Sequence, residues 1–267
     1  MNDRATDGVH TSQWGAAGVV LVHGGTPGGG ADAFAAQRPL AERWHMLLPD
    51  RPGHGKTPAR GREDFERDAA LLSPLLGPSG AHLVGHSYGG VVAIYIAAQH
   101  PDLVRSLTLI EPPAFWLAPH DEATVAMSAA NRALTNDPPA DPRETLERFF
   151  ALVGMEPLPP ALAQMNPLPP PLVRAAEIVL ALRGPWEGTI PMTDLVAGGY
   201  PIQVLTSGRI AGFEGIAQAM VEGAGATHVV VPGTHHAVQD AAEAVNPLLE
   251  QFWLAAETPK HAGSLGH

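Results

Sequence analysis

Ser87 lies within the stretch Gly85-His86-Ser87-Tyr88-Gly89, a G-x-S-x-G pattern. The stretch follows a short apolar run at residues 81–84 and precedes a longer one at 90–98, so we expect it to join a strand to a helix. A serine in such a tight turn stands above the edge of the sheet, at the positive end of the helix. Its flanking glycines avoid collisions with the neighbouring backbone. This placement predicts a nucleophilic serine.

Candidate bases follow the last apolar run of strand character, at residues 228–231. A serine hydroxyl is a weak nucleophile, which needs a base within hydrogen-bond reach and a carboxylate to orient that base. His235 and His236 both lie just beyond this run. An isolated histidine in a loop is usually only a polar surface residue, but this pair falls where a base for Ser87 is needed.

Two carboxylates compete for the role of the orienting acid. Glu111 directly follows the apolar run 104–110, whereas Glu214 lies several residues beyond the run 202–206. Catalytic groups gather at the carboxyl ends of strands in open α/β sheets, and a strand tip next to that of Ser87 can reach the same histidine. Glu111 is therefore the preferred acid, with a helix-capping or surface role as its alternative.

The oxyanion of an acyl-transfer intermediate needs backbone N–H donors. Tyr88, the residue after the nucleophile, is one candidate because it begins the helix. The other is Gly25, in the loop His23-Gly24-Gly25 that follows the first apolar strand at residues 19–22. A plain turn in a glycine-rich loop is the alternative interpretation of Gly25.

Composition narrows the function classes. Lys and Arg total 16 against 27 Asp and Glu, which gives a net charge of −11, and no basic patch is visible, so a nucleic-acid partner is not expected. The chain has no cysteine, which excludes disulfides and thiolate metal sites. No metal or other cofactor is expected, because the histidines lack a ligand spacing such as H-E-x-x-H. The apolar runs are too short to cross a bilayer, and the polar start lacks a signal core, so we expect a cytoplasmic protein without membrane contact.

The order of elements predicts a mainly parallel α/β sheet flanked by helices. Apolar strand-like runs alternate with helical spacing up to Glu111 and again from about residue 200. Between them, helical stretches are separated by proline clusters, which is typical of an inserted helical cap. The expected organisation is a core of residues 1–112 and 200–257, a cap of residues 113–199 and a flexible tail of residues 258–267. The expected elements are strands at 19–22, 44–49, 81–84, 104–110, 202–206 and 228–231, and helices at 31–43, 64–76, 90–98, 123–134, 143–153, 171–183, 213–222 and 241–256.

These motifs resemble those of the α/β-hydrolase superfamily. The likeness covers about residues 15–112 and 200–257, in the segments 23–25, 50–57, 85–90, 109–112 and 233–236. It implies an order of nucleophile, acid and histidine that Ser87, Glu111 and His236 follow. Related chains carry Pro-Gly-x-Gly-His after the last strand, which favours His236 over His235. They often carry Gly-x-x-Asp after the cap, where this chain has no aspartate; an acid placed before the cap is similar to some haloalkane dehalogenases and lactone hydrolases.

The resemblance implies a serine hydrolase that cleaves a carboxylic ester or a lactone, a small-molecule substrate. It leaves open C–C bond hydrolysis, thioester cleavage or perhydrolysis on the same residues, and also a non-catalytic ligand receptor. The sequence leaves open whether the protein forms a homodimer. Substrate shape would be set by the cap. The side chains expected to line the pocket are His23, Trp116, Met127 and Trp186, with lid-core packing as their alternative.

Overall fold

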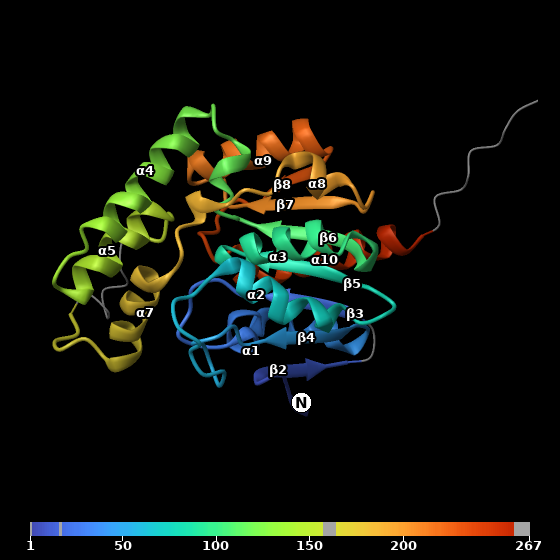
Figure 1. Cartoon of the computed structure of the whole chain (residues 1–267), viewed down its shortest axis with the longest axis horizontal. Helices are drawn as coiled ribbons and strands as arrows, with labels where there is room; N and C mark the ends of the chain where they lie inside the picture. The colour runs from blue at the N-terminus through green and yellow to red at the C-terminus, as the bar shows by residue number, and fades with distance from the viewer. Residues whose placement is uncertain (1, 16–17, 157–163, 259–267) are drawn as a thin grey trace, which may run out of the picture.

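One sheet organises the computed structural model, which describes residues 2–15, 18–156 and 164–258 (Figure 1). Its strand order is β1-β2-β4-β3-β5-β6-β7-β8. The strands are β1 Asn2–Thr6, β2 Val9–Trp14, β3 Gly18–Val22, β4 His45–Pro49, β5 Ala81–His86, β6 Val104–Ile110, β7 Ile202–Thr206 and β8 Thr227–Val230. From β4 to β8 all pairs are parallel, whereas β1 and β2 join antiparallel at one edge. The predicted parallel sheet is confirmed, and the antiparallel edge is an addition to it.

Helices cover both faces of the sheet. The α-helices are α1 Gly30–Ala33, α2 Phe65–Leu72, α3 Tyr88–Gln99, α4 Glu122–Asn136, α5 Pro142–Leu152, α7 Pro170–Ala181, α8 Met192–Val196, α9 Ala211–Ala224 and α10 Ala242–Glu257. The short 3-10 helices are η1 Ala35–Glu42, η2 Ser73–Leu76, η3 Pro101–Leu103, η4 Phe115–Leu117, η5 Pro185–Glu187 and η6 Val238–Asp240. Two of the predicted helices, at 31–43 and 64–76, are each split into an α-helix and a 3-10 helix, and each contains a proline, which cannot donate a backbone N–H.

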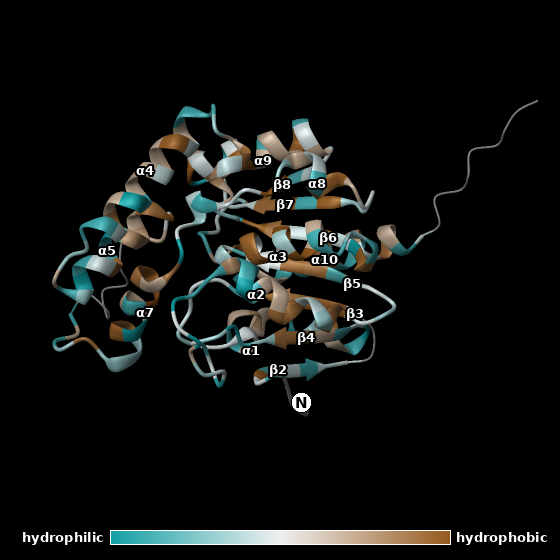
Figure 2. Ribbon diagram, viewed as in Figure 1, coloured by the Kyte–Doolittle hydropathy of each residue, from teal (hydrophilic) through white to brown (hydrophobic). Residues whose placement is uncertain are grey.

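Two apolar clusters make up the core, one on each side of the sheet. One joins the strands to α2, α3 and α9, and the other joins them to η1 and α10. The central strands β5 and β6 are almost entirely buried, as expected of parallel strands covered on both faces. Figure 2 shows this apolar centre within more polar outer helices.

The helices α4, α5 and α7 stand beside the sheet rather than on its faces (Figure 1). They lie in the sequence between β6 and β7, where the insertion was expected, and they pack against one another. Part of this stretch, residues 157–163, and residues 259–267 of the expected tail fall outside the described residues. No helix among the residues described is both long and apolar enough to span a membrane. The cytoplasmic location stays a prediction.

Candidate active site

Ser87 occupies a strained turn between β5 and α3. Its φ is +52°, a left-handed value that residues with a Cβ adopt only where the surroundings hold them there. The Ser87 N–H donates to the carbonyl of Ile110 at the end of β6, 2.9 Å away. A Cβ on Gly85 would lie 2.5 Å from the carbonyl oxygen of Gly89, and one on Gly89 would lie 2.2 Å from that of Val22. The two glycines of the pattern are therefore required by close backbone approach.

Glu111 occupies the equivalent position at the end of the neighbouring strand, β6. Its φ is also positive, +42°, and its N–H donates to the carbonyl of Leu205 in β7, 3.0 Å away. The side chain is completely buried. A buried carboxylate on a strained backbone must be held by its neighbours, because burial of a charge without partners is costly.

His236 joins these two side chains. Its Nε2 lies 2.8 Å from Ser87 Oγ, and its Nδ1 lies 2.7 Å from Glu111 Oε2. His235 is exposed, and its Nδ1 instead accepts a hydrogen bond from the N–H of Ala237. The structure thus brings together the three side chains singled out in the sequence, and of the two adjacent histidines it places His236 at the serine.

The other oxygen of Glu111 is held by Ser207, which directly follows β7. The Ser207 N–H and hydroxyl donate to Glu111 Oε1 at 2.7 and 2.5 Å. Glu214, the competing acid, lies on α9, with its Oε2 3.5 Å from Nε2 of His228. Both oxygens of Glu111 therefore have partners, and Glu214 faces a different histidine.

Two further rings pack against His236. Phe213, at the start of α9, stacks on the imidazole with a centroid separation of 5.1 Å and an angle of 12°. His86 lies 4.9 Å away on another side, and its Nε2 is 3.0 Å from the carbonyl oxygen of His236. Burial, together with the adjacent His236, lowers the pKa of His86 to about 3. His86 is therefore neutral near pH 7, and it donates from Nε2 while Gln239 donates to its Nδ1 at 3.4 Å.

The loop that carries Gly25 is fixed from behind by the buried side chain of Arg51. Its Nε donates to the carbonyl of His23 at 3.0 Å, and Nη2 donates to that of Gly24 at 3.1 Å. Its Nη1 pairs with Asp68 at 2.8 Å. Burial opposes the charge, but Asp68 and Glu63 outweigh it and raise the pKa of Arg51. The guanidinium stays charged and holds the two carbonyls that precede Gly25.

Two cavities meet at Ser87. An enclosed one of about 50 Å³ is lined by Ser87, Gly25 and Tyr88 together with apolar side chains that include Met127, Phe149, Val179, Trp186 and Phe213. A wider one of about 350 Å³ is lined by Gly25, Ser87 and His236 and by residues of α5, α7 and η6. Gly25 and Tyr88, the expected oxyanion donors, thus border the same cavity as the serine hydroxyl.

The expected pocket residues divide into three groups. Met127 and Trp186 line the cavity at Ser87, as expected. Trp116 instead lines a separate outer groove, where its Nε1 donates to the carbonyl of Ile190. His23 is completely buried behind its loop, and its two ring nitrogens contact Gly24 O and the N–H of Arg51, so it was misplaced as a pocket residue. Burial, followed by the charge of Arg51, lowers its pKa well below the ordinary range.

Three contributors to the site were missed in the sequence. Ser207 could have been found as the polar residue that ends a buried strand at the same sheet edge as Glu111. Arg51 belongs to the segment 50–57, which contributes to the family resemblance without a role for this residue, and its burial gives no sequence signal. Phe213 begins a predicted helix, and nothing in its sequence context indicates a contact with His236. Each acts through contacts between segments far apart in the chain.

Fold and site together identify the class of protein. The chain belongs to the family described as the alpha/beta hydrolase fold, whose sequence profile matches residues 18–154.

Among its relatives is the pimeloyl-[acyl-carrier protein] methyl ester esterase of Chromobacterium violaceum, which is 40% identical over 140 residues, or 50% of this chain and 52% of the relative. The chain thus spans about half the length of this curated relative. A variant of the N-acyl homoserine lactonase AidH complexed with N-hexanoyl homoserine superposes with a TM-score of 0.69 and 20% identity, over 97% of this chain and 98% of the other. A thermophilic esterase from Thermogutta terrifontis gives a TM-score of 0.62 and 23% identity, over 96% and 97%. At these identities the two structures establish the fold alone.

Proposed function

We propose that the protein is a serine hydrolase that cleaves a carboxylic ester or a lactone through an acyl-enzyme on Ser87. The observation that carries the proposal is the unbroken chain of contacts from Ser87 Oγ to His236 Nε2, at 2.8 Å, and from His236 Nδ1 to Glu111 Oε2, at 2.7 Å. These separations match the reach that proton transfer to a general base requires. The ester-cleaving activity named for the Chromobacterium relative also favours it.

In the proposed cycle, Ser87 attacks the substrate carbonyl as His236 takes the hydroxyl proton. Glu111 holds the imidazole in the required tautomer and stabilises its cation. The N–H groups of Gly25 and Tyr88 receive the oxyanion; that of Tyr88 is free to do so because the first N–H groups of a helix have no partner within it. His236 then protonates the leaving alkoxide, and water attacks the acyl-enzyme with His236 again as the base.

The helices between β6 and β7 act in this proposal as a cap. Side chains of α5 and α7 line both cavities at Ser87, and those of α4 line the enclosed one, so the insertion encloses the space where a substrate would react. The enclosed cavity is lined mainly by apolar side chains, which favours it as the place where the acyl group of the ester binds. The wider cavity, on the His236 side, is then the side from which the alcohol leaves and water enters.

Turnover of phenyl esters of increasing acyl length, and of a panel of lactones, tests the proposal. Ser87→Ala should reduce kcat by at least about a thousandfold, because the nucleophile and its base act as a unit. Ser79→Ala is the matched control, because Ser79 is exposed and lies before β5, at the opposite end of that strand from Ser87. Equal turnover by wild type and Ser87→Ala would refute the proposal, and tight ligand binding without turnover would favour a receptor instead.

A further inference from the structure

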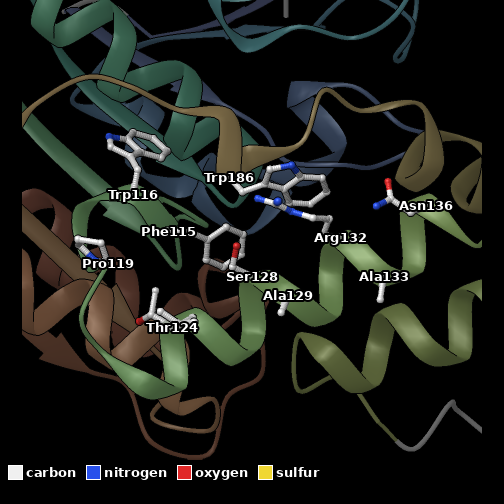
Figure 3. A pocket seen from close by; sticks show the side chains of 11 residues that line it. Phe115, Trp116, Pro119, Thr124, Ser128, Ala129, Arg132, Ala133, Asn136 and Trp186 are labelled. Carbon is white, nitrogen blue, oxygen red and sulfur yellow. The ribbon is translucent and has the colours of Figure 1, made fainter.

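An open groove of about 590 Å³ runs along the outward side of α4, apart from the cavities at Ser87 (Figure 3). Its walls come from α4 and from the segments around η4 and η5. They are Phe115, Trp116, Pro119, Thr124, Val125, Ser128, Ala129, Arg132, Ala133, Asn136 and Trp186. The lining of the groove therefore combines aromatic rings with a row of polar side chains on one face of α4.

Phe115 and Trp186 lie between this groove and the enclosed cavity, because both side chains line both spaces. The indole of Trp186 packs closely against the backbone of Gly184, where an added Cβ would lie only 2.2 Å from indole Cε2. The two rings thus form a thin wall. The cavity on the Ser87 side measures about 50 Å³. Because a dry cavity that holds benzene measures about 150 Å³, a long acyl chain bound on the enclosed side of Ser87 does not fit there unless it extends past this wall.

Beyond the wall stands the cation of Arg132. The Arg132 guanidinium carbon lies 5.3 Å from the centroid of the Trp186 ring, and Figure 3 shows the two side chains together. Among the described residues, no carboxylate lies within ion-pair distance of it. Ser128 and Asn136 stand one helical turn before and after Arg132 and border the same groove. In a chain of net charge −11, such a cation in a ring-walled groove is suited to an anion.

We propose that the groove is the distal subsite of the acyl group, and that it takes an acyl chain ending in a carboxylate. The carbonyl of the ester sits at Ser87, the methylene chain passes between Phe115 and Trp186, and Arg132 binds the terminal carboxylate with help from Ser128 and Asn136. This inference rests on the proposed function for the position of the reacting carbonyl. The reaction remains hydrolysis: water and the ester give a dicarboxylate and an alcohol.

Paired phenyl esters test the subsite. Phenyl octanoate and the phenyl monoester of octanedioic acid differ at the far end, which is a methyl group in one and a carboxylate in the other. Arg132→Gln should lower the ratio of their kcat/KM values, charged over neutral, about tenfold, because a hydrogen-bonded charge pair is lost. Arg148→Gln is the matched control, since Arg148 is an exposed arginine of α5 paired with Glu144. It should leave the ratio within about twofold.

The wall is tested by Trp186→Ala. Removal of the indole should raise the preference for octanoyl over acetyl esters at least about fivefold, because the longer chain then enters the groove without displacing a ring. An unchanged chain-length preference would overturn the route past Trp186. A charged-to-neutral ratio that is unchanged in Arg132→Gln, or that falls equally in Arg148→Gln, would overturn the carboxylate subsite.

Binding provides a readout that does not depend on turnover. In the Ser87→Ala background, calorimetry with the octanedioate monoester should show a Kd about tenfold weaker when Arg132→Gln is added. If the wild type hydrolyses no ester but this difference is present, the proposed function fails and the subsite survives. If esters are hydrolysed but both Kd values are equal, the subsite fails alone.

Discussion

Ser207 donates two hydrogen bonds to a single oxygen of Glu111, from its N–H at 2.7 Å and from its hydroxyl at 2.5 Å. The second carboxylate oxygen is thereby left to His236. Ser207 directly follows β7, and Glu111 directly follows β6. A residue at the end of β7 thus supports the carboxylate at the end of the neighbouring strand, β6.

Ser207→Ala should lower kcat about tenfold with little change in KM. The hydroxyl makes a charge-assisted hydrogen bond to a buried carboxylate, and its loss leaves Glu111 held by one N–H and freer to turn from His236. Steady-state kinetics on phenyl acetate would measure this, with Ser79→Ala as control. A kcat equal to that of the wild type would show that the backbone N–H alone positions Glu111.

Glu111→Gln should reduce kcat by about 10³- to 10⁴-fold, because an amide in place of the carboxylate no longer holds the imidazole in the productive tautomer. Glu214→Gln should change kcat less than about twofold, since Glu214 contacts His228 rather than His236. Kinetics of both variants, with thermal melting to verify folding, make the comparison. A large loss in Glu214→Gln with little in Glu111→Gln would reverse the assignment of the acid.

Arg51→Lys should lower kcat by about tenfold or more while KM changes little. Lysine keeps the charge near Asp68 but lacks the fork of nitrogens that reaches the carbonyls of His23 and Gly24, so the Gly25 N–H is held less firmly. Arg51→Met should instead destabilise the fold by about 3–5 kcal/mol, because it removes the cation that pairs with the buried carboxylate of Asp68. Activity assays and urea unfolding separate the two effects. An Arg51→Lys enzyme with wild-type kcat would argue against the positioning role.

Stability should fall as the pH drops from 7 to 4.5, partly through His82. Burial lowers the pKa of His82 from 6.5 to about 4, so the unfolded chain takes up a proton in this range before the folded chain does. His82 packs against the rings of Trp44 and Trp253, and its Nδ1 lies 2.8 Å from Ser106 Oγ. His82→Phe should therefore reduce the loss of unfolding free energy between these pH values by about 2 kcal/mol. Urea unfolding at both pH values measures it, with exposed His120→Gln as control; an equal loss in His82→Phe would contradict it.

The strand ends that carry the site were predictable from the sequence. Ser87 and Glu111 each follow a strand-like run rich in apolar residues, and adjacent parallel strands bring such ends to one edge. The strands β1 and β2 were not predicted. The sequence of β2, VHTSQW, carries several polar residues, and its pairing with β4 is a long-range contact rather than a local pattern.

The contacts around His236 could not be predicted from the sequence. The stack of Phe213 on the imidazole and the contact of His86 with the backbone of His236 depend on how α9 and the last loop pack over the sheet. No motif encodes such contacts, since they join residues distant in the chain. The outer position of Trp116 was unpredictable for the same reason, because the sequence did not determine which side of α4 each aromatic ring would occupy.

Labelling with a fluorophosphonate, followed by mass spectrometry of the adduct, tests the proposed Ser87–His236–Glu111 arrangement most directly. We expect one adduct per chain, on Ser87, and labelling slower by at least about a hundredfold in His236→Ala, since the alkoxide then forms without a base. Glu111→Gln should also label more slowly. An adduct on another serine, or labelling of Ser87 at the wild-type rate without His236, would contradict the proposed mechanism.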